Sequence, residues 1–449
     1  LSAALGLPLA YLMRSVKIKG SSFLNILIVI SYLSPPFIGA YAWIQMLGRQ
    51  GVITQFLNDT FGLHYGGVYG FAGIVLVFTL QSFPLVYIYV SGALKNLDNS
   101  LNEAAESLGC SRMGRIWKII VPLVMPTLLA SSMLVFMRVF ADFGTPMLIG
   151  EGYKTLPVLI YNQFMGEVSG DDGFAAAICC IVIGLTIVMF FVQRFLAGRN
   201  TYAMTALKPM AAESLGGLRN ILAHLAVYMV VGLAILPQFV VVYTSFLATN
   251  GGQVFTGGFA LQSYDATLFA KDNDVIWHTY FLGLCAIAAV LVLGVLIAYL
   301  SVRKRNTLNS ILDVITMFPF IIPGSVLGIA FVFAFNKSPI ILTGTALIMI
   351  ISFAVRRMPY TVRSSTAILG NISPSIEEAA ISLGASDMTA FRKITVPMMM
   401  PGVLSGAIMS WVTIISELSS SIILYTNSTQ TLTVSIYTEV IRGNYGNAS

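Results

Sequence analysis

Two carboxylates stand out in a sequence that carries few charges. Only 10% of the 449 residues are charged and 57% are hydrophobic, whereas soluble domains typically carry about 25% charged residues. Asp142 and Glu417 lie 275 residues apart, each near the end of a long apolar stretch. Ionisable groups in such stretches are costly and usually face a cavity or a partner. A facing pair of carboxylates would suit a hard cation, because hard cations prefer oxygen ligands.

Two alternatives for these carboxylates stay open. Arg138 lies four residues before Asp142 and could pair with it on one face of a helix. Capping of a helix end would explain Glu417 equally well. Other potential ligands show no spacing typical of a metal site, since the histidines are isolated and the cysteines are predicted to be small apolar filler. These residues are His64, His224, His278, Cys110, Cys179, Cys180 and Cys285.

The offset of 275 residues also relates two copies of a longer motif. Each copy consists of Glu-Ala-Ala, a glycine, a proline thirteen residues after the glycine, and a second proline four residues later. The copies are Glu103-Ala104-Ala105 with Gly109, Pro122 and Pro126, and Glu378-Ala379-Ala380 with Gly384, Pro397 and Pro401. Chance does not reproduce three offsets around one core, so the sequence indicates an internal duplication.

Each copy of the motif predicts a short helix. Ser100 with Glu103, and Ser375 with Glu378, form the S-x-x-E pattern of a capping box, in which the serine accepts from first-turn amides and the glutamate reaches back. The glycine then ends the helix, because it permits the turn. Such a helix could simply lie on a membrane surface. Held between two spans, it would instead act as a lever for any partner that grips it.

Long apolar segments predict a polytopic helical membrane protein. Apolar runs of roughly 20 residues are long enough to cross a hydrocarbon core of about 30 Å. Pro35-Pro36 and Pro323-Gly324 fall at matching places in two such runs and predict kinks or interruptions, which either line a path or serve packing. The nine complete spans that we predict are 22–47, 71–93, 119–141, 173–195, 219–247, 276–300, 308–335, 339–360 and 396–421.

The basic residues predict the orientation of these spans. Both Glu-Ala-Ala loops lie on the side that is rich in Lys and Arg, which the positive-inside rule makes cytoplasmic. The halves are then parallel repeats of about six transmembrane helices each, related by a pseudo-twofold axis along the membrane normal. No nucleic-acid motif accompanies the charge, so nucleic-acid binding is not expected. The segments that hold 19 of the 25 Lys and Arg residues are 14–20, 95–118, 194–219, 301–305 and 356–393.

The duplication predicts the domain organisation. We predict a first repeat at 1–196, a cytoplasmic linker at 197–217 and a second repeat at 218–449. Residues 1–13 are apolar but too short to span, and the segment after Ile441 ends in an external loop. We therefore expect truncation at both ends, with an incomplete first helix and a missing last helix. A pseudo-twofold bundle of this kind encloses a path along its axis, which favours transport.

The two loops closely resemble the EAA loop of permease subunits of binding-protein-dependent ABC importers. In both copies the match to that pattern extends from the Glu-Ala-Ala core as far as the second proline. The family has an aromatic residue seven positions after the glycine. Phe391 fits that position in the second copy, whereas the first copy has Ile116 there. The resemblance implies an all-α type I importer fold, with a coupling helix in each half that docks into a groove of a cytoplasmic ATPase subunit. It assigns the ATPase contact to Glu103, Ala104, Ala105, Gly109, Glu378, Ala379, Ala380 and Gly384.

The resemblance also implies the partners and the location. It implies two copies of a cytoplasmic ABC ATPase, an extracytoplasmic substrate-binding protein, and a multi-pass protein surrounded by lipid in the bacterial cytoplasmic (inner) membrane. The chain contains no G-x-x-x-x-G-K-[ST] motif that could cradle phosphate. ATP and Mg²⁺ are therefore expected on the partner ATPase, and neither a cofactor nor an enzymatic activity is expected in this chain.

Fusion of both halves in one chain resembles the ferric-iron permeases, with thiamine, phosphonate and sugar-phosphate permeases as relatives. The stretches 141–146 and 417–421 look most like the iron branch. We therefore expect ferric iron as the cargo and place Asp142, Glu417 and Arg138 along the path. A secondary transporter is the alternative from a different class. It would normally place ion-coupling charges near the membrane midplane, whereas these three residues cluster toward one end.

Overall fold

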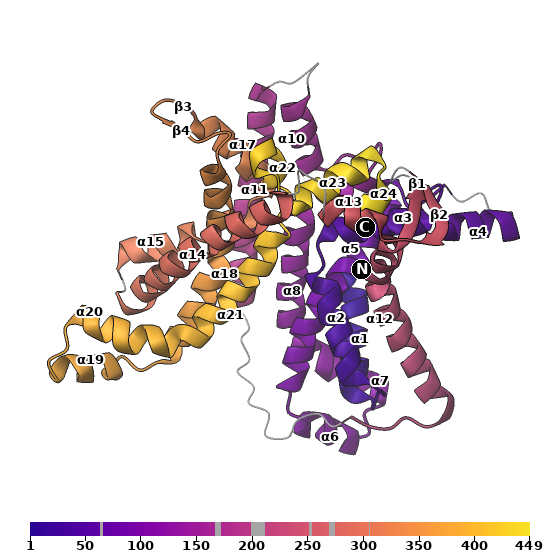
Figure 1. Ribbon diagram of the computed structural model, residues 1–449. Coiled ribbons are helices and arrows are strands. Elements are labelled where there is room, and N and C mark those ends of the chain that lie inside the picture. Colours follow the sequence, from indigo (N-terminus) through magenta and orange to yellow (C-terminus); the bar gives the residue numbers. More distant parts are fainter. Residues whose placement is uncertain (63–65, 167–171, 199–211, 251–253, 269–273, 305) are drawn as a thin grey trace. The chain divides into compact units, whose positions relative to one another are not determined.

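The protein is mostly helical and divides into two compact units (Figure 1). The computed structural model describes residues 1–62, 66–166, 172–198, 212–250, 254–268, 274–304 and 306–449. Unit 1 comprises Leu1–Val158 and Gly184–Thr244, and unit 2 comprises Leu159–Ile183 and Ser245–Ser449. Each unit therefore receives a segment from the other half of the sequence.

Unit 1 is built around α5, an apolar helix whose buried face includes Val77, Phe83 and Val86. Helices α1, α2, α3, α8 and α9 pack against it. Helices α10 (Leu156–Met165) and α11 (Asp172–Gly198) are divided between the units. The elements of unit 1 are α1 (Ser2–Ser15), α2 (Ser21–Leu33), α3 (Pro36–Leu47), α4 (Val52–Phe61), α5 (Gly70–Lys95), α6 (Ser100–Ser107), α7 (Arg112–Arg115), the π-helix η1 (Ile116–Ile120), α8 (Val121–Ala141), α9 (Gly144–Ile149) and nearly all of α12 (Gly217–Ser245).

Unit 2 repeats this plan around α18, which packs between α14 and α21. Two short antiparallel hairpins, β1–β2 and β3–β4, complete it. Its elements are β1 (Leu247–Asn250), β2 (Val254–Phe259), α13 (Gln262–Leu268), α14 (Asp274–Arg303), α15 (Thr307–Ile315), α16 (Phe318–Ile321), α17 (Gly324–Phe335), β3 (Asn336–Lys337), β4 (Ile340–Ile341), α18 (Ala346–Asn371), α19 (Ser375–Ser382), α20 (Asp387–Ala390), the π-helix η2 (Phe391–Thr395), α21 (Val396–Ile415), α22 (Ser421–Leu424), the 3-10 helix η3 (Asn427–Thr429), α23 (Leu432–Arg442) and α24 (Tyr445–Ala448).

The apolar helices confirm most of the predicted spans. Six helical segments of the described residues are long and apolar enough to cross a membrane, or eight if each of two bent pairs counts as one span. The predicted span at 339–360 falls partly on α18, whose 26 residues include Arg356, Arg357 and Arg363. The six segments are Gly70–Lys95, Arg112–Ala141, Gly173–Gln193, Gly217–Ser245, Asp274–Arg303 and Asp387–Ile415.

The two bent pairs confirm that the proline-containing sites interrupt their helices. The angle is 100° between Ser21–Leu33 and Pro36–Phe61, which meet at Pro35-Pro36, and 111° between Thr307–Ile321 and Gly324–Phe335, which meet at Pro323-Gly324. A proline lacks the amide hydrogen that a helix interior needs and its ring clashes with the preceding turn, so the second helix starts anew after it. The predicted kinks are therefore complete breaks.

The basic residues of α18 correct part of the predicted orientation. We predicted Arg356 and Arg357 in the cytoplasmic segment 356–393. Both lie inside α18, and at 1.5 Å per residue Arg356 is about 22 Å along the helix from Asn371, where the loop to α19 begins. They therefore do not belong with the basic residues beside α19. The remaining cytoplasmic segments still hold 17 of the 25 Lys and Arg residues, which preserves the orientation.

The predicted repeat boundaries remain a prediction. Most of the predicted linker at 197–217 lies outside the described residues. The compact units follow spatial contacts rather than sequence repeats, because α12 packs with unit 1 although it begins the second half of the sequence.

The packing of α21 on α18 makes a first testable prediction. A β-carbon on Gly406 would lie 2.6 Å from the Cα of Thr361 and 2.9 Å from the carbonyl oxygen of Tyr360, which are backbone atoms that cannot move cheaply. Gly406→Ala should therefore destabilise the protein by about 1–3 kcal/mol. Gly370→Ala is the matched control, since nothing lies within 4 Å of its β-carbon position. Thermal unfolding in detergent measures both, and equal midpoints would contradict the proposed close packing.

Candidate functional site

The two Glu-Ala-Ala segments fold into the same structure. Each forms a short helix, α6 or α19, that ends at a glycine in the left-handed region, with φ of +80° at Gly109 and +93° at Gly384. After the glycine, the amide of Cys110 donates to the carbonyl of Ala105 at 2.9 Å, and that of Ala385 donates to Ala380 at 3.0 Å. This hydrogen bond across five residues is the Schellman ending that a C-terminal glycine allows.

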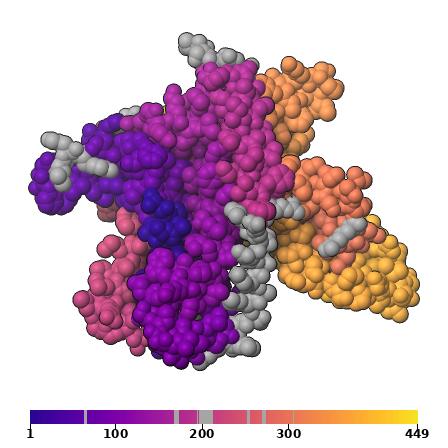
Figure 2. Space-filling view, turned by 180° about the vertical axis from the view of Figure 1, so that it is seen from behind, coloured from indigo at the N-terminus to yellow at the C-terminus, as the bar shows by residue number. Residues whose placement is uncertain are grey.

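The two segments also present the same surface. Exposed, half-buried and buried positions agree along 100–120 and 375–395, except at Arg115 and Ala390. Each segment lies at one end of its own unit, away from the core (Figure 2). Of the residues that the resemblance assigns to the ATPase contact, two are half-buried, Ala105 and Ala380. The exposed ones are Glu103, Ala104, Gly109, Glu378, Ala379 and Gly384.

Exposed apolar side chains repeat at the same positions, and our reading of the sequence missed them. Leu108 is 88% exposed and its counterpart Leu383 is 89% exposed. We call the two sets of exposed residues the apolar knobs: Leu101, Leu108 and Met113 in the first copy, and Ile376, Leu383 and Met388 in the second. The signal was present, since a leucine directly precedes the glycine in each copy of the motif.

The predicted capping boxes are wrong. Neither α6 nor α19 has a side-chain cap, because Ser100 and Ser375 are the first helical residues rather than the caps. The carboxylate of Asp98 accepts from the amide of Ser100 at 3.0 Å instead. In the second copy the hydroxyl of Ser373 accepts from the amide of Ser375 at 3.4 Å. The polar side chain that turns the chain into the helix therefore lies two residues earlier than predicted.

A second local feature recurs after each short helix. Residues 116–120 and 391–395 are π-helical, and the amides of Val121 and Val396 donate five residues back to Ile116 and Phe391. The prolines of the motif explain this widening, because a proline ring needs room beside the carbonyl four residues earlier. The short helices α6 and α19, which we call the lever helices, are thus followed by matching π-helical segments that lead into α8 and α21.

The second lever helix is tied to its unit by a buried ion pair. Arg303, at the end of α14, donates through Nε to Glu377 at 2.8 Å and through Nη2 to the carbonyl of Ile372 at 2.9 Å. Tyr299 donates to the same carboxylate at 3.3 Å, and its ring lies 4.7 Å from that of Phe391. The first copy has Asn102 in place of Glu377. Its helix is instead stabilised by an ion pair between Glu106 and Arg115.

Asp142 and Glu417 occupy equivalent places in the two units. Asp142 follows α8 and accepts from the amide of Thr145 at 2.9 Å, in the first turn of α9. Glu417 follows α21 and accepts from the amide of Ser420 at 3.2 Å, beside the start of α22. Each carboxylate therefore accepts from the amide three residues ahead, in the turn that leads to the next short helix. The N-cap residues of α9 and α22 are Phe143 and Ser420, and capping by Glu417 stays a prediction. The guanidinium of Arg138 lies 4.6 Å from the centre of the Tyr32 ring.

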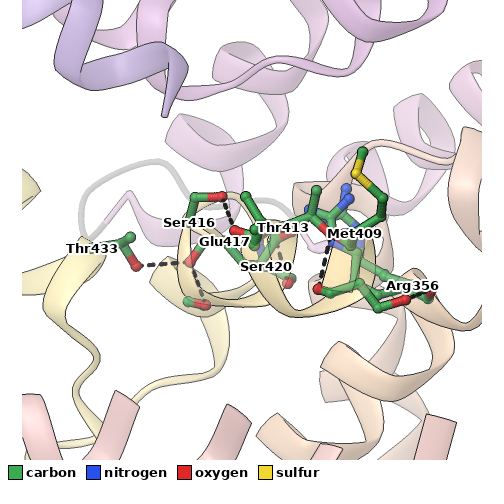
Figure 3. A network of polar contacts seen from close by, with 11 residues as sticks. Arg356, Met409, Thr413, Ser416, Glu417, Ser420 and Thr433 are labelled. Carbon is green, nitrogen blue, oxygen red and sulfur yellow. Dashed lines mark hydrogen bonds and ion pairs between the residues drawn. The ribbon is translucent and has the colours of Figure 1, made fainter. Parts of the chain in front are cut away.

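Glu417 is also held by two arginines of α18; Figure 3 labels Glu417 and the first of them, Arg356. Its Oε1 pairs with Nη1 of Arg356 and its Oε2 with Nη2 of Arg357. The hydroxyls of Ser421 and Thr433 donate to its backbone carbonyl at 2.9 and 2.8 Å. The residue thereby joins α18, α21, α22 and α23. Sequence reasoning missed these partners because they are separated from Glu417 by about sixty residues.

The described residues contain no group of three or more His, Cys, Asp or Glu side chains that could hold a metal ion. His224 accepts a hydrogen bond from the amide of Lys19, and its Nδ1 lies 2.8 Å from the carbonyl of Asn220. His64 lies outside the described residues. Asp142 and Glu417 belong to different units, so a facing pair of carboxylates remains a prediction.

This arrangement of apolar helices and repeated polar loops matches a known family of transport proteins. The profile of the binding-protein-dependent transport system inner membrane component matches residues 3–202 and 290–443. The chain therefore belongs to that family and is a multi-pass inner-membrane protein.

Its relatives include permeases with several named cargoes. It is 30% identical, over 99% of its length, to the ferric transport system permease protein FbpB of Actinobacillus pleuropneumoniae. It is also 30% identical, over 96%, to the putative ferric transport system permease protein FbpB 1 of Haemophilus influenzae. The chain spans 65% and 68% of these two relatives. The molybdenum transport system permease protein ModB of Escherichia coli is 28% identical over 44% of the chain and is itself 86% covered.

The ion pair of the second lever helix makes a testable prediction. Glu377→Gln should free α19 from α14, because it removes the charge that the buried Arg303 side chain faces. Hydrogen exchange of the α19 amides should become about tenfold faster, as expected for the loss of roughly 1.4 kcal/mol. Glu378→Gln is the matched control, since Glu378 is exposed. Equal exchange in both variants would show that the ion pair does not hold the helix.

Proposed function

We propose that this chain forms the transmembrane pathway of an ATP-driven importer and couples to separate ATPase subunits. The observation that carries the proposal is the pair of lever segments, α6 and α19, which share one fold and one exposed surface. A duplicated surface of this kind suits two copies of one partner. Family membership supports this, since the family comprises components of binding-protein-dependent transport systems.

The proposed partners divide the chemistry between several polypeptides. Two copies of a cytoplasmic ABC ATPase hold ATP and Mg²⁺, and an extracytoplasmic binding protein delivers the cargo to the opposite face. The permease chain itself catalyses no reaction in this proposal. Each ATPase grips one lever helix, and closure of the ATPase pair moves the two levers. Because α18 precedes the second lever and α20 and η2 connect it to α21, movement of α19 shifts both long helices.

The apolar knobs supply the main contact energy in this proposal. An exposed leucine that becomes fully buried contributes roughly 1.5–3 kcal/mol, and a few central side chains usually dominate an interface. The exposed carboxylates Glu103 and Glu378 lie on the same helices and add orientation rather than affinity. The small side chains Ala104 and Ala379 allow a partner to approach the helix closely.

Ferric iron is the cargo that we propose. Two relatives that align with nearly the whole chain are named as ferric transport permeases. Other oxygen-rich cargoes are alternatives within the same class, because a molybdenum permease and a putative 2-aminoethylphosphonate permease, PhnV of Salmonella paratyphi A, each match under half of the chain. Thiamine and sugar phosphates were further alternatives from the sequence.

Substitution of the apolar knobs tests whether the chain couples to the ATPase. Leu108→Glu together with Leu383→Glu should abolish co-purification of the ATPase, because each substitution places a charge in a desolvated contact, at a cost of about 2 kcal/mol or roughly thirtyfold in affinity. Leu308→Glu is the control, since this leucine of α15 is similarly exposed. Retained co-purification in the double variant would reject the knobs as the contact.

Uptake measurements separate the importer from a secondary transporter. Vesicles containing the chain, the ATPase and the binding protein should accumulate ⁵⁵Fe only with internal ATP, because ATP closure drives the levers. A secondary transporter would continue when ATP is depleted and stop when the ion gradient is dissipated. Competition by unlabelled ferric iron, molybdate and 2-aminoethylphosphonate then identifies the cargo.

A further inference from the structure

The second unit contains a buried surplus of positive charge. Arg356, Arg357 and Glu417 have side chains that are 8%, 17% and 2% exposed, and both arginines pair with the one carboxylate (Figure 3). Two guanidinium groups and one carboxylate leave a net charge of +1 where α18 packs against the end of α21. Buried charge of this kind is costly unless it is compensated, and within membrane proteins it usually marks a functional site.

The surplus charge comes with unused hydrogen-bond donors. Among the described residues, the buried Nε atoms of Arg356 and Arg357 have no hydrogen-bond partner, and neither does the hydroxyl of Ser325, a fully buried residue. A guanidinium offers five donors in a planar fork that matches oxygen pairs. The carboxylate of Glu417 therefore accepts from only some of the hydrogen-bond donors of the two guanidinium groups.

The start of α17 adds a third source of positive potential. A β-carbon on Gly324 would overlap Nη1 of Arg356, so the guanidinium lies directly against the first residue of this helix. Helix α17 has no side-chain cap, because its N-cap residue is Pro323. The amides at a helix N-terminus attract negative charge, and Ser325 lies in the same first turn. The guanidinium of Arg356 thus lies at a helix N-terminus, and both groups favour an anion.

The first unit lacks this charge at the equivalent place. Gln81 and Ser82 correspond to Arg356 and Arg357 at the 275-residue offset. Gln81 also lies at a helix break, where its Nε2 donates to the carbonyl of Pro36 at 2.7 Å. A neutral amide is thus sufficient to serve a helix break of this kind. The two arginines of the second unit therefore exceed what the break requires.

We propose that Arg356 and Arg357 form a binding site for a small oxyanion, or for an anionic oxygen group of the cargo, and that Glu417 occupies this site in the present conformation. An incoming anion displaces the carboxylate and takes both guanidinium groups. Because Glu417 joins α21 and α22 to α18 through these pairs, displacement releases that junction. Binding of the anion is thereby coupled to a change in the second unit.

This site deepens the proposed function by restricting the chemical form of the cargo. A bare ferric ion would meet a net positive charge and would compete with two guanidinium groups for Glu417. An oxyanion, or a ferric ion wrapped in anionic oxygen ligands, has the opposite charge and suits paired guanidinium donors. A free oxyanion and the anionic oxygen ligands around a ferric ion would bind the guanidinium groups in the same way, and the uptake experiment below distinguishes them.

The binding test uses the permease–ATPase complex in lipid nanodiscs, with molybdate and phosphate as separate probes. Calorimetric titration of the Glu417→Gln complex should show at least tenfold tighter binding than the unaltered complex, because the internal competitor has lost its charge. Arg357→Gln should abolish binding while leaving the neutral Arg356–Glu417 pair in place, so this variant is expected to fold. Arg363→Gln, which removes another arginine of α18 that pairs with Asp313 rather than with Glu417, should leave binding unchanged.

Two results would overturn the proposal: anion binding that Arg357→Gln does not weaken, or no anion binding to either the unaltered complex or Glu417→Gln. Co-purification of the ATPase in every variant shows that the proposed function holds independently of this site. Vesicle uptake then separates the sources. An oxyanion cargo predicts uptake of ⁹⁹Mo-molybdate that Arg357→Gln abolishes, whereas an anion-wrapped metal predicts ⁵⁵Fe uptake that requires added phosphate and that the same variant abolishes.

Discussion

The constraint on which the rest of the structure depends is the satisfaction of polar groups inside apolar helices. Lipid offers no hydrogen bonds, so a broken helix must find partners within the protein. At each break one polar side chain of a long helix lies close by. Gln81 of α5 serves the break at Pro36, and Arg356 of α18 lies against the break at Gly324. Each break is thereby joined to the helix that leads to a lever.

That connection gives the levers a direct mechanical route. One end of α18 continues into α19, and Arg356 lies about 22 Å away along the same helix, at the break. In the proposed function, the π-helical segment η2 passes motion of the same lever into α21, which ends beside Glu417. The ion pairs of Glu417 with Arg356 and Arg357 connect the end of α21 back to α18. A partner that moves α19 therefore acts on the break through two helices at once.

The two halves share the surface of their lever segments and differ in the polar residues beside their helix breaks. The lever segments agree in turn geometry, hydrogen bonds and exposed leucines, as expected where both face copies of one partner. The junctions differ in charge, with Gln81 and Asp142 in one half and Arg356, Arg357 and Glu417 in the other. A fused chain allows this divergence, because each half can change without altering its counterpart.

The sequence by itself determined the features that depend on local chemistry. Gly109 and Gly384 had to end their helices, and Pro35-Pro36 and Pro323-Gly324 had to interrupt theirs, because backbone sterics act over a few residues. Tertiary structure decided the partners of Glu417, the depth of Arg356 and Arg357 within α18, and the tie between Glu377 and Arg303. A count of basic residues along the chain could not place those arginines, since only packing between helices distant in sequence brings their charge to a buried carboxylate.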